Sequence, residues 1–489
     1  MTLTRAIANA NSGLAAASLR AEIAANNVAN ASTPGYVRRT VDLAESRLGG
    51  SGTGVVVSGV IRTENPALTA ERRQAESSAG RADIISQAFT ELNRVLGEPD
   101  DTTGLFNSYQ RFETAMRELT VTPESPALQN ALYGATADVV SEFNLIYSKG
   151  QQMRNDADAS IENAVTTVNN ALQDIADLNE KITALPENST EAAVLLDQRQ
   201  QLVDQVSQFI PVKQLPTGEG EISLITAEGV FLLSGAPREI EFTRTPFIGP
   251  GATYDNGTGS LSGLSVDGQN ITPGSDSTFA IQSGLMAGYF AVRDDVAFNF
   301  LEQVDSLAAD LISRFSNDAL DPTKAPGAAG IFTDNGGPVD PTNIDGIAQR
   351  MTINAAVDPA QGGLVSRFRD GVGATTEGPA GDATIPASLL NAFTERQPVS
   401  AGTGLTGTLS VSEAVAGVTS LIGEERIRSD AVLSSARARA EILSDAEIAQ
   451  TGVDTDQELQ SLLLIEQAYT ANARVIQTIN DMFNRLLEL

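Results

Sequence analysis

The sequence contains no cysteine, no histidine and no tryptophan among its 489 residues. Without cysteine the chain forms no disulfide, no thiolate zinc site and no cysteine nucleophile. Without histidine it has neither the commonest general base nor a Ser-His-Asp triad. We therefore expect a protein that is not an enzyme, with no catalytic residue, no cofactor and no metal ion. The length implies two or more domains with cores of their own.

Two stretches resemble ligand-binding motifs only in part. The string GTGLTG at residues 402–407 fits G-x-G-x-x-G by letter, but no βαβ pattern surrounds it. The Gly- and Asp-rich residues 249–278 lack the order of ligands of an EF-hand. Both stretches are interpreted as turns.

Charge and hydropathy exclude two classes of partner. The chain has 32 basic and 62 acidic residues, a net charge of −30, so phosphate backbones would be repelled and nucleic-acid binding is not expected. No run of 18 apolar residues is present, which predicts no membrane span. Residues 1–30 lack the apolar block of a secretory signal. The chain is thus expected to be cytoplasmic or exported with an uncleaved N-terminus.

The first helix is predicted over residues 3–28, where apolar side chains alternate at steps of four and three. Half of them are alanine, so a partner helix can approach closely. Alanine offers little area to bury, and the helix alone should be marginal in water. The positions are Leu3, Ile7, Ala10, Leu14, Ala17, Ala21, Ala24 and Val28.

The stretch ANNVANASTPGYVRR at residues 25–39 ends this helix. Pro34 disfavours helix in the residue before it, and Pro34-Gly35 suits the centre of a type II turn. A helix end and a turn account for the proline and the glycine. They do not account for three asparagines at Asn26, Asn27 and Asn30.

The middle of the chain alternates between helical and β patterns. Short strands are predicted over 37–63, helices over about 67–210 with a turn at Pro186, strands over 211–280, helix over 282–317, and short strands in the Gly/Pro-rich 318–410. Two helical stripes are predicted to be buried: Ile161, Val165, Val168, Leu172, Ile175, Asn179 and Ile182; and Phe300, Val304, Leu307, Leu311 and Phe315.

The last helix has the strongest heptad of the chain, after a break at Gly452 and Asp454. Asn472 is its one strongly polar member and is expected to fix register. Residues 445–489 carry eight acidic and two basic residues, whereas residues 1–48 carry five arginines and three acidic residues. The two ends are thus complementary in charge. The heptad positions are Leu462, Ile465, Tyr469, Asn472, Ile476, Ile479, Phe483 and Leu486.

These patterns predict an elongated, nested, multidomain α+β protein. Residues 1–60 would form a coiled-coil helix and turn segment, and residues 445–489 the closing coiled-coil helix. Residues 61–210, 281–318 and 412–444 would form a helical bundle domain. Residues 211–280 and 319–411 would form an inserted, β-rich outer region. Neither terminal helix can bury its apolar face alone, so both need partners.

Both ends resemble one protein family. ANNVANASTPGY resembles the signature of bacterial flagellar rod, hook and hook-associated proteins, and GVDTDQELQSLLLIEQAYTANARVIQTINDMFNRLLEL resembles their closing helix, above all in QAYTANARVI. Rod and hook members pass from the signature into β structure, whereas this chain inserts about 140 helical residues at 67–210. Residues 282–317 also resemble the internal helix of a hook-associated member. The resemblance is therefore to the hook-associated branch.

The resemblance implies a structural protein that joins hook to filament as a ring of subunits. The terminal helices would form an inner tube, the helical domain the next layer, and the β domains the outside. The chain would be exported through the flagellar channel without cleavage and reside extracellularly at the junction. Its partners would be further copies, the hook protein, a second junction protein or the filament, and an export chaperone at the last helix.

The resemblance also assigns roles within the two ends. The asparagines would hydrogen-bond between subunits, Pro34-Gly35 would turn the chain, and Tyr36 would pack at that corner. Gly35→Val and Asn30→Leu are expected to block attachment without changing monomer stability. The residues expected to carry assembly are Leu3, Ile7, Leu14, Asn26, Asn27, Val28, Asn30, Thr33, Pro34, Gly35, Tyr36, Leu462, Ile465, Tyr469, Asn472, Ile476, Ile479, Phe483 and Leu486.

Two alternative interpretations remain. A hook or distal rod protein would have less helix. A secreted coiled-coil adhesin or effector, from a different class, would have terminal helices that are stable in the monomer and would not bind hook ends.

Overall fold

The computed structural model describes residues 3–48, 51–97, 103–186, 188–218 and 220–487. Its helices are α1 (Leu3–Asn30), α2 (Pro66–Leu96), α3 (Leu105–Val121), α4 (Pro126–Thr183), α5 (Thr190–Phe209), α6 (Gly284–Ala291), the π-helical segment η1 (Val292–Val296), α7 (Ala297–Phe315), α8 (Ile347–Arg350), the 3₁₀ turn η2 (Pro359–Gln361), α9 (Arg367–Asp370), α10 (Thr384–Thr394), the 3₁₀ turn η3 (Ala401–Thr403), α11 (Val411–Thr451) and α12 (Thr455–Leu487).

The strands are short and form five small antiparallel sheets among the described residues. They are β1 (Arg39–Leu48), β2 (Ser51–Arg62), β3 (Val212–Gly218), β4 (Glu221–Thr226), β5 (Phe231–Ser234), β6 (Ala236–Pro237), β7 (Ile240–Glu241), β8 (Ser265–Val266), β9 (Gln269–Asn270), β10 (Phe332–Asp334), β11 (Met351–Ile353), β12 (Gln397–Pro398) and β13 (Thr408–Leu409).

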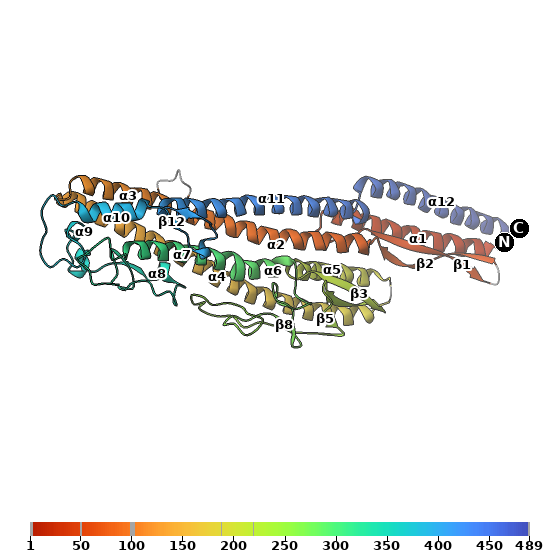
Figure 1. The fold of residues 1–489 in the computed structure, drawn as a ribbon. Helices are drawn as coiled ribbons and strands as arrows, with labels where there is room; N and C mark the ends of the chain where they lie inside the picture. Colours follow the sequence, from red (N-terminus) through yellow and green to blue (C-terminus); the bar gives the residue numbers. More distant parts are fainter. Residues whose placement is uncertain (1–2, 49–50, 98–102, 187, 219, 488–489) are drawn as a thin grey trace.

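The molecule is elongated, and both ends of the chain lie at one tip (Figure 1). There α1 and α12 lie side by side, and the β1–β2 hairpin lies along α1. Helix α4 has 58 residues and is therefore about 87 Å long, which sets the length of the helical body. The fold is α+β with terminal helices that enclose the rest of the chain, as the sequence predicts.

Local sequence signals place the ends of the long helices. Ser410 and Glu413 form a capping box at the start of α11, in which each side chain bonds the other residue's backbone N–H. Asn65 and Ser125 cap α2 and α4, and a proline follows each cap as the first helical residue. Helix α11 ends at Thr451, at the predicted break.

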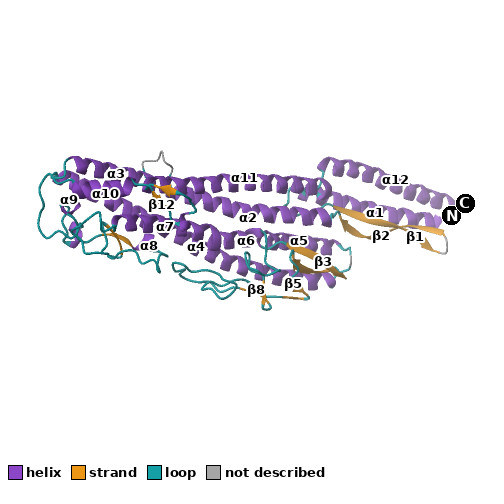
Figure 2. Cartoon of the chain, viewed as in Figure 1, coloured by secondary structure: helices purple, strands orange, loops and turns teal. Residues whose placement is uncertain are grey.

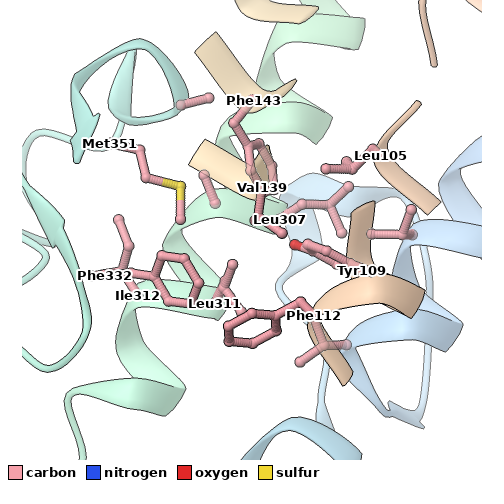
Figure 3. Close-up of a cluster of buried hydrophobic side chains, with 14 of the residues drawn as sticks. Leu105, Tyr109, Phe112, Val139, Phe143, Leu307, Leu311, Ile312, Phe332 and Met351 are labelled. Carbon is pink, nitrogen blue, oxygen red and sulfur yellow. The ribbon is translucent and has the colours of Figure 1, made fainter. Parts of the chain in front are cut away.

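The tip farthest from the termini contains the larger core, formed mainly by α3, α4, α7, α10 and α11. Figure 3 shows Tyr109 and Phe112 of α3 facing Val139 and Phe143 of α4 and the apolar side of α7. The α7 stripe is buried as predicted. Aromatic rings cluster within this core, and Phe112 lies 5.4–5.8 Å from three other phenylalanine rings.

A second core lies between α4, α5, α6 and the strands β3–β9. The predicted α4 stripe is buried there, and the predicted turn at Pro186 separates α4 from α5. Several polar α4 side chains bind the backbone of the irregular outer segment. Asn169, for example, bonds both the N–H and the carbonyl of Ile240.

Residues 318–410 contain more helix and less strand than the sequence pattern indicates (Figure 2). Strands β10–β13 have two or three residues each, whereas α10 has 11 residues. Ile385, Leu389, Ala392 and Phe393 are buried on one side of α10. Their helical spacing is a signal that the sequence analysis missed. Among the described residues, no helix is long and apolar enough to cross a bilayer.

Candidate functional site: the paired terminal helices

Helices α1 and α12 form the candidate site, because they bring the two ends of the chain together (Figure 1). Ile465, Asn472 and Ile479 are seven residues apart and so share one side of α12. Ile465 and Ile479 are buried, and Asn472 meets Gly13 on α1. A Cβ atom at Gly13 would lie only 2.8 Å from the Asn472 amide nitrogen. The Gly13–Asn472 contact therefore opposes any shift in register.

The turn after α1 has the predicted geometry. Gly35 has φ +75°, and the Tyr36 N–H donates to the Thr33 carbonyl at 3.1 Å, as in a type II turn centred on Pro34 and Gly35. The Gln201 side chain on α5 donates to the Pro34 carbonyl at 2.8 Å. A side chain at Gly35 would be strained by the positive φ and would meet Gln201. The expectation that Gly35→Val leaves monomer stability unchanged is therefore corrected.

Asn27 acts within its own chain. Its side chain is buried, and Nδ2 donates to the Arg39 carbonyl at 2.8 Å. Its Oδ1 accepts from the Arg39 N–H at 3.1 Å and from the Tyr36 hydroxyl at 2.9 Å. Burial raises the pKa of Tyr36, so this hydroxyl stays a donor at neutral pH. The expectation of a bond between subunits was wrong for Asn27, which instead clamps the hairpin to α1.

The other two asparagines lie closer to solvent. Asn26 is exposed and Asn30 is partly exposed. The Asn30 side chain donates to the Asn26 carbonyl at 2.9 Å, and its Oδ1 accepts from Thr33 at 3.2 Å. These bonds stabilise the last turn of α1, where carbonyls lack helical partners.

An ion pair joins the two ends of the chain. Arg38 Nε lies 2.7 Å from Glu458 Oε1 on α12, and the Glu458 side chain is only 4% exposed. The Arg38 N–H also donates to the Thr451 carbonyl at the end of α11. A buried carboxylate is costly without a partner. This pair therefore favours the arrangement in which α12 turns back along α1.

A set of buried charges fastens the β1–β2 hairpin to the helical body. Arg39 and Arg62 are cross-strand partners, and both pair with Asp197 on α5, at 2.5 and 2.7 Å. The shared carboxylate offsets the repulsion between the two guanidinium groups.

A second set of charges joins α2, α5 and α11 next to the hairpin. Arg72 pairs with Asp204 at 2.9 Å, with Glu76 at 2.6 Å and with Glu447. Burial lowers the pKa of Arg72, but Asp204, Glu76 and Glu447 outweigh it and raise the pKa overall. The guanidinium stays charged, and the joint between the terminal helices and the body is held by ion pairs.

Helix α12 exposes several large apolar side chains in the single chain. Leu463 is 60% exposed and Leu464 is 65% exposed. A groove of about 700 Å³ between α1 and α12 is lined by Ala17, Ala21 and Leu463, among others. Helix α12 therefore pairs with α1 through Ile465 and Ile479 and leaves other large apolar side chains without cover in the single chain. The exposed large apolar residues of α12 are Leu459, Leu463, Leu464, Tyr469, Val475, Met482 and Phe483.

The structure places most of the expected assembly residues at this tip, with different exposures. Those that are buried are Asn27, Ile465 and Ile479. Those that are partly buried are Leu3, Ile7, Leu14, Val28, Asn30, Tyr36, Leu462, Asn472 and Ile476. Those that are exposed are Asn26, Thr33, Pro34, Gly35, Tyr469 and Phe483. The side chain of Leu486 lies outside the described residues.

The residues of the site that were not expected from the sequence include Gly13, Arg38, Asp197 and Glu458. A glycine inside an Ala-rich helix was a usable signal for Gly13, because glycine there is otherwise destabilising. The ion pairs join residues that are far apart in the sequence, and no local pattern indicates them. Within the described parts of the chain, no group of three or more acidic side chains is placed to hold a metal ion.

Three family models match this chain in segments that follow the observed fold. A model of the helical domain of flagellar hook-associated protein FlgK matches residues 89–328. A model of the C-terminal part of flagellar basal body rod FlgEFG proteins matches residues 448–489, and a model of flagella basal body rod proteins matches residues 7–36. The chain belongs to the flagellar hook-associated protein family.

Relatives of this hook-associated chain match it over nearly its whole length. It is 24% identical to flagellar hook-associated protein 1 of Bacillus subtilis, over 95% of this chain and 94% of that protein. It is 25% identical to the protein of the same name from Escherichia coli, over 99% of both chains. The solved hook junction protein FlgK from Burkholderia pseudomallei is 18% identical, with a TM-score of 0.43 over 55% of this chain and 46% of that chain.

The family membership sets the general function. The chain is a structural protein of the bacterial flagellum that assembles with other flagellar components.

Proposed function

We propose that this chain joins the flagellar hook to the filament as a ring of subunits. The large apolar side chains that α12 leaves uncovered are the observation that supports this proposal most strongly. Contiguous exposed apolar surface on a soluble chain is typical of a binding surface. A helix that is paired on one side and apolar on the other fits a closed tube, in which each α1–α12 pair contacts the next copy.

The division of the chain follows from this arrangement. Residues 1–60 and 445–489 would form the inner tube. Residues 61–210, 281–318 and 412–444 would form a helical layer around it, and residues 211–280 and 319–411 would face outward. The ion pairs of Asp197, Arg72 and Glu447 lie where the tube would meet the helical layer, so they would fix the angle between the two.

The expected assembly residues divide into two roles. Ile465, Asn472 and Ile479 would hold α12 on α1 within one copy. Tyr469 and Phe483, together with the rest of the exposed α12 face, would contact neighbouring copies. Asn26 and Thr33 lie at the exposed helix end and would meet the next subunit there.

The partners would be the hook protein on one side and a second junction protein or the filament on the other. The chain would be exported through the flagellar channel without cleavage of its N-terminus and would reside outside the cell. Before export, a chaperone would cover the apolar face of α12, because an uncovered face of this size favours aggregation.

Attachment to isolated hooks tests the proposal. We would measure how strongly the labelled chain binds to hook ends. A double variant of α12, Leu463→Ser with Val475→Ser, would be compared with a control double variant, Val121→Ser with Leu364→Ser. Both pairs replace exposed apolar side chains, but the second pair lies outside the terminal helices. We expect the α12 pair to weaken attachment at least about tenfold and the matched pair to leave it unchanged. Equal attachment by the two variants would contradict the proposal.

A further inference from the structure

A groove runs between α2 and α11, apart from the terminal helices. It consists of two adjoining hollows of about 590 and 510 Å³, and both are lined by Ser78, Arg428, Val432 and Ala436. Small side chains along the groove leave room for a helix to approach closely. The further lining residues used below are Arg81, Ser435 and Arg439.

Helix α11 is open along this groove. It has 41 residues, and between positions 423 and 446 only Ser429 and Leu433 are buried. Ile427, Val432 and Ile442 are more than half exposed. Ile448, near the end of α11, is also more than half exposed. This stretch of α11 is therefore largely without cover in the single chain.

The edges of the groove are basic, although the whole chain carries a net charge of −30. Arg81, Arg428 and Arg439 are all exposed. Arg428 pairs with Glu425 at 2.5 Å, whereas neither Arg81 nor Arg439 forms an ion pair with any residue that the structure describes. The charged residues that line the groove are three arginines and Glu425, and this surplus of arginine beside apolar surface favours an acidic partner.

A matching acidic surface lies on α4. Asp174 and Asp177 are exposed and line a hollow of about 410 Å³ between α4 and α5. Lys181 is the one basic residue of that lining, and neither aspartate forms an ion pair with a described residue. In Figure 1 α11 and α2 run along one long edge of the helical body, and α4 lies below α5 and α6. In each copy, the basic groove therefore lies on α2 and α11, and the acidic surface lies on α4 and α5.

We propose that the acidic α4–α5 surface of a second copy of this chain docks into the α2–α11 groove. Because the two surfaces differ, the contact is heterologous, and repetition of such a contact produces a ring or a helical array. Opposite charges would set the register, and Val432 would become buried. This inference rests on the proposed function, since it supplies the contact between copies outside the terminal tube.

Cysteine pairing tests the contact directly, because the natural chain contains no cysteine. One preparation would carry Ser435→Cys in the groove, and a second would carry Asp177→Cys on α4. When the two variants are mixed on hooks under oxidising conditions, a disulfide should join one copy of each. This mixed dimer should be more abundant than either homodimer. Ser435→Cys mixed with Asn130→Cys, an exposed residue elsewhere on α4, is the matched control. A yield equal to the control would overturn the proposal.

Charge reversal provides a second, independent test. Two double variants reverse the charge on one side of the contact: Arg428→Glu with Arg439→Glu, and Asp174→Arg with Asp177→Arg. Each should weaken the association of copies about tenfold. The chain with all four changes should recover most of the wild-type association. Arg94→Glu/Arg117→Glu, at exposed sites outside the groove, controls for net charge. If the fourfold variant remains as weak as either double variant, the contact is wrong.

The two proposals fail in different ways. If the wild-type chain does not bind hook ends, the proposed function is wrong and this contact loses its basis. If the wild-type chain binds but both groove tests match their controls, only the α2–α11 contact is wrong.

Discussion

The two tips of this molecule use opposite kinds of surface. At the far tip, Tyr109, Phe112 and Phe143 are fully buried among other aromatic rings. At the terminal tip, Gly13 meets Asn472, Ile465 and Ile479 are the only buried apolar residues among the described side chains of α12, and large apolar residues such as Leu463 face solvent. Aromatic residues bury much more area than alanine. Stability is therefore concentrated at the far tip, whereas the terminal tip retains apolar surface for partners.

The polar contacts differ in the same way. Near the termini, buried carboxylates of Asp197, Glu447 and Glu458 bridge elements that are distant in sequence. Such pairs give orientation more than net stability, because desolvation offsets much of the attraction. The terminal tip is thus held at a defined angle without a large core of its own.

The largest loss of stability is expected from Phe112→Ala in the far core. Removing a buried phenylalanine costs about 3–5 kcal/mol, because area is lost and a cavity remains. Denaturant unfolding measures the change. The exposed Phe247→Ala is the matched control and should change the free energy of unfolding by less than about 0.5 kcal/mol. A small effect of Phe112→Ala would show that the far core does not dominate stability.

A loss of about 3 kcal/mol, confined to the terminal tip, is expected from Asn27→Ala. The change leaves the Arg39 backbone groups and the Tyr36 hydroxyl without their buried partner. Hydrogen exchange should increase in the hairpin and in α1 while α3 and α7 remain protected. Asn26→Ala, at the exposed neighbouring position, is the control. Exchange that increases uniformly along the chain would contradict the separation of the two tips.

A pH-dependent effect of about 2 kcal/mol is expected at Asp305 in α7. Burial raises the pKa of this carboxyl to about 7, although the backbone N–H groups of Gly346 and Ala348 donate to it and lower the pKa. The unfolded value is about 3.9. A carboxyl whose pKa is higher in the fold than in the unfolded chain stabilises the fold fully at pH values below about 3.9. This stabilisation is lost as the pH rises through about 7.

Thermal unfolding at pH 5.5 and pH 8 measures this contribution. The wild-type midpoint should fall over this interval by more than that of Asp305→Asn, which has no titratable group there. Both proteins contain the same other carboxylates. Subtracting the fall in midpoint of Asp305→Asn from that of the wild type therefore leaves the contribution of Asp305. Equal pH dependence in both would mean that Asp305 ionises normally in the fold.

The smallest effect on stability is expected from Leu463→Ser on the exposed face of α12. The free energy of unfolding should change by less than about 0.5 kcal/mol, because the side chain is already in water. Binding to hook ends, in contrast, should decrease clearly. A substitution that lowers both equally would indicate that this face is covered within the single chain.

Much of the fold follows from local patterns in the sequence. The stripes of α4 and α7, the break before α12 and the Pro34–Gly35 turn all depend on residues close together in the chain. The role of Asn27 did not follow, because its partners at Tyr36 and Arg39 only meet it after the hairpin folds back. The helix α10 was missed because the surrounding glycines and prolines hid a short apolar repeat.

The candidate site was predictable as a pair of helix faces but not as a set of contacts. The heptad patterns indicated that α1 and α12 need partner helices. The opposite charges of the two chain ends indicated that these ends attract each other. The contact between Gly13 and Asn472 and the ion pair between Arg38 and Glu458 both depend on how α12 lies relative to α1. Such geometry is tertiary and leaves no trace in residue spacing.

Hydrogen exchange of the full chain, free and bound to hook ends, tests the central claim most directly. We expect strong protection of α3, α4 and α7 in both states, and weak protection of α12 in the free chain that rises sharply on attachment. If attachment leaves α12 unchanged and instead protects residues 318–410, the terminal helices are not the assembly surface and the account is wrong.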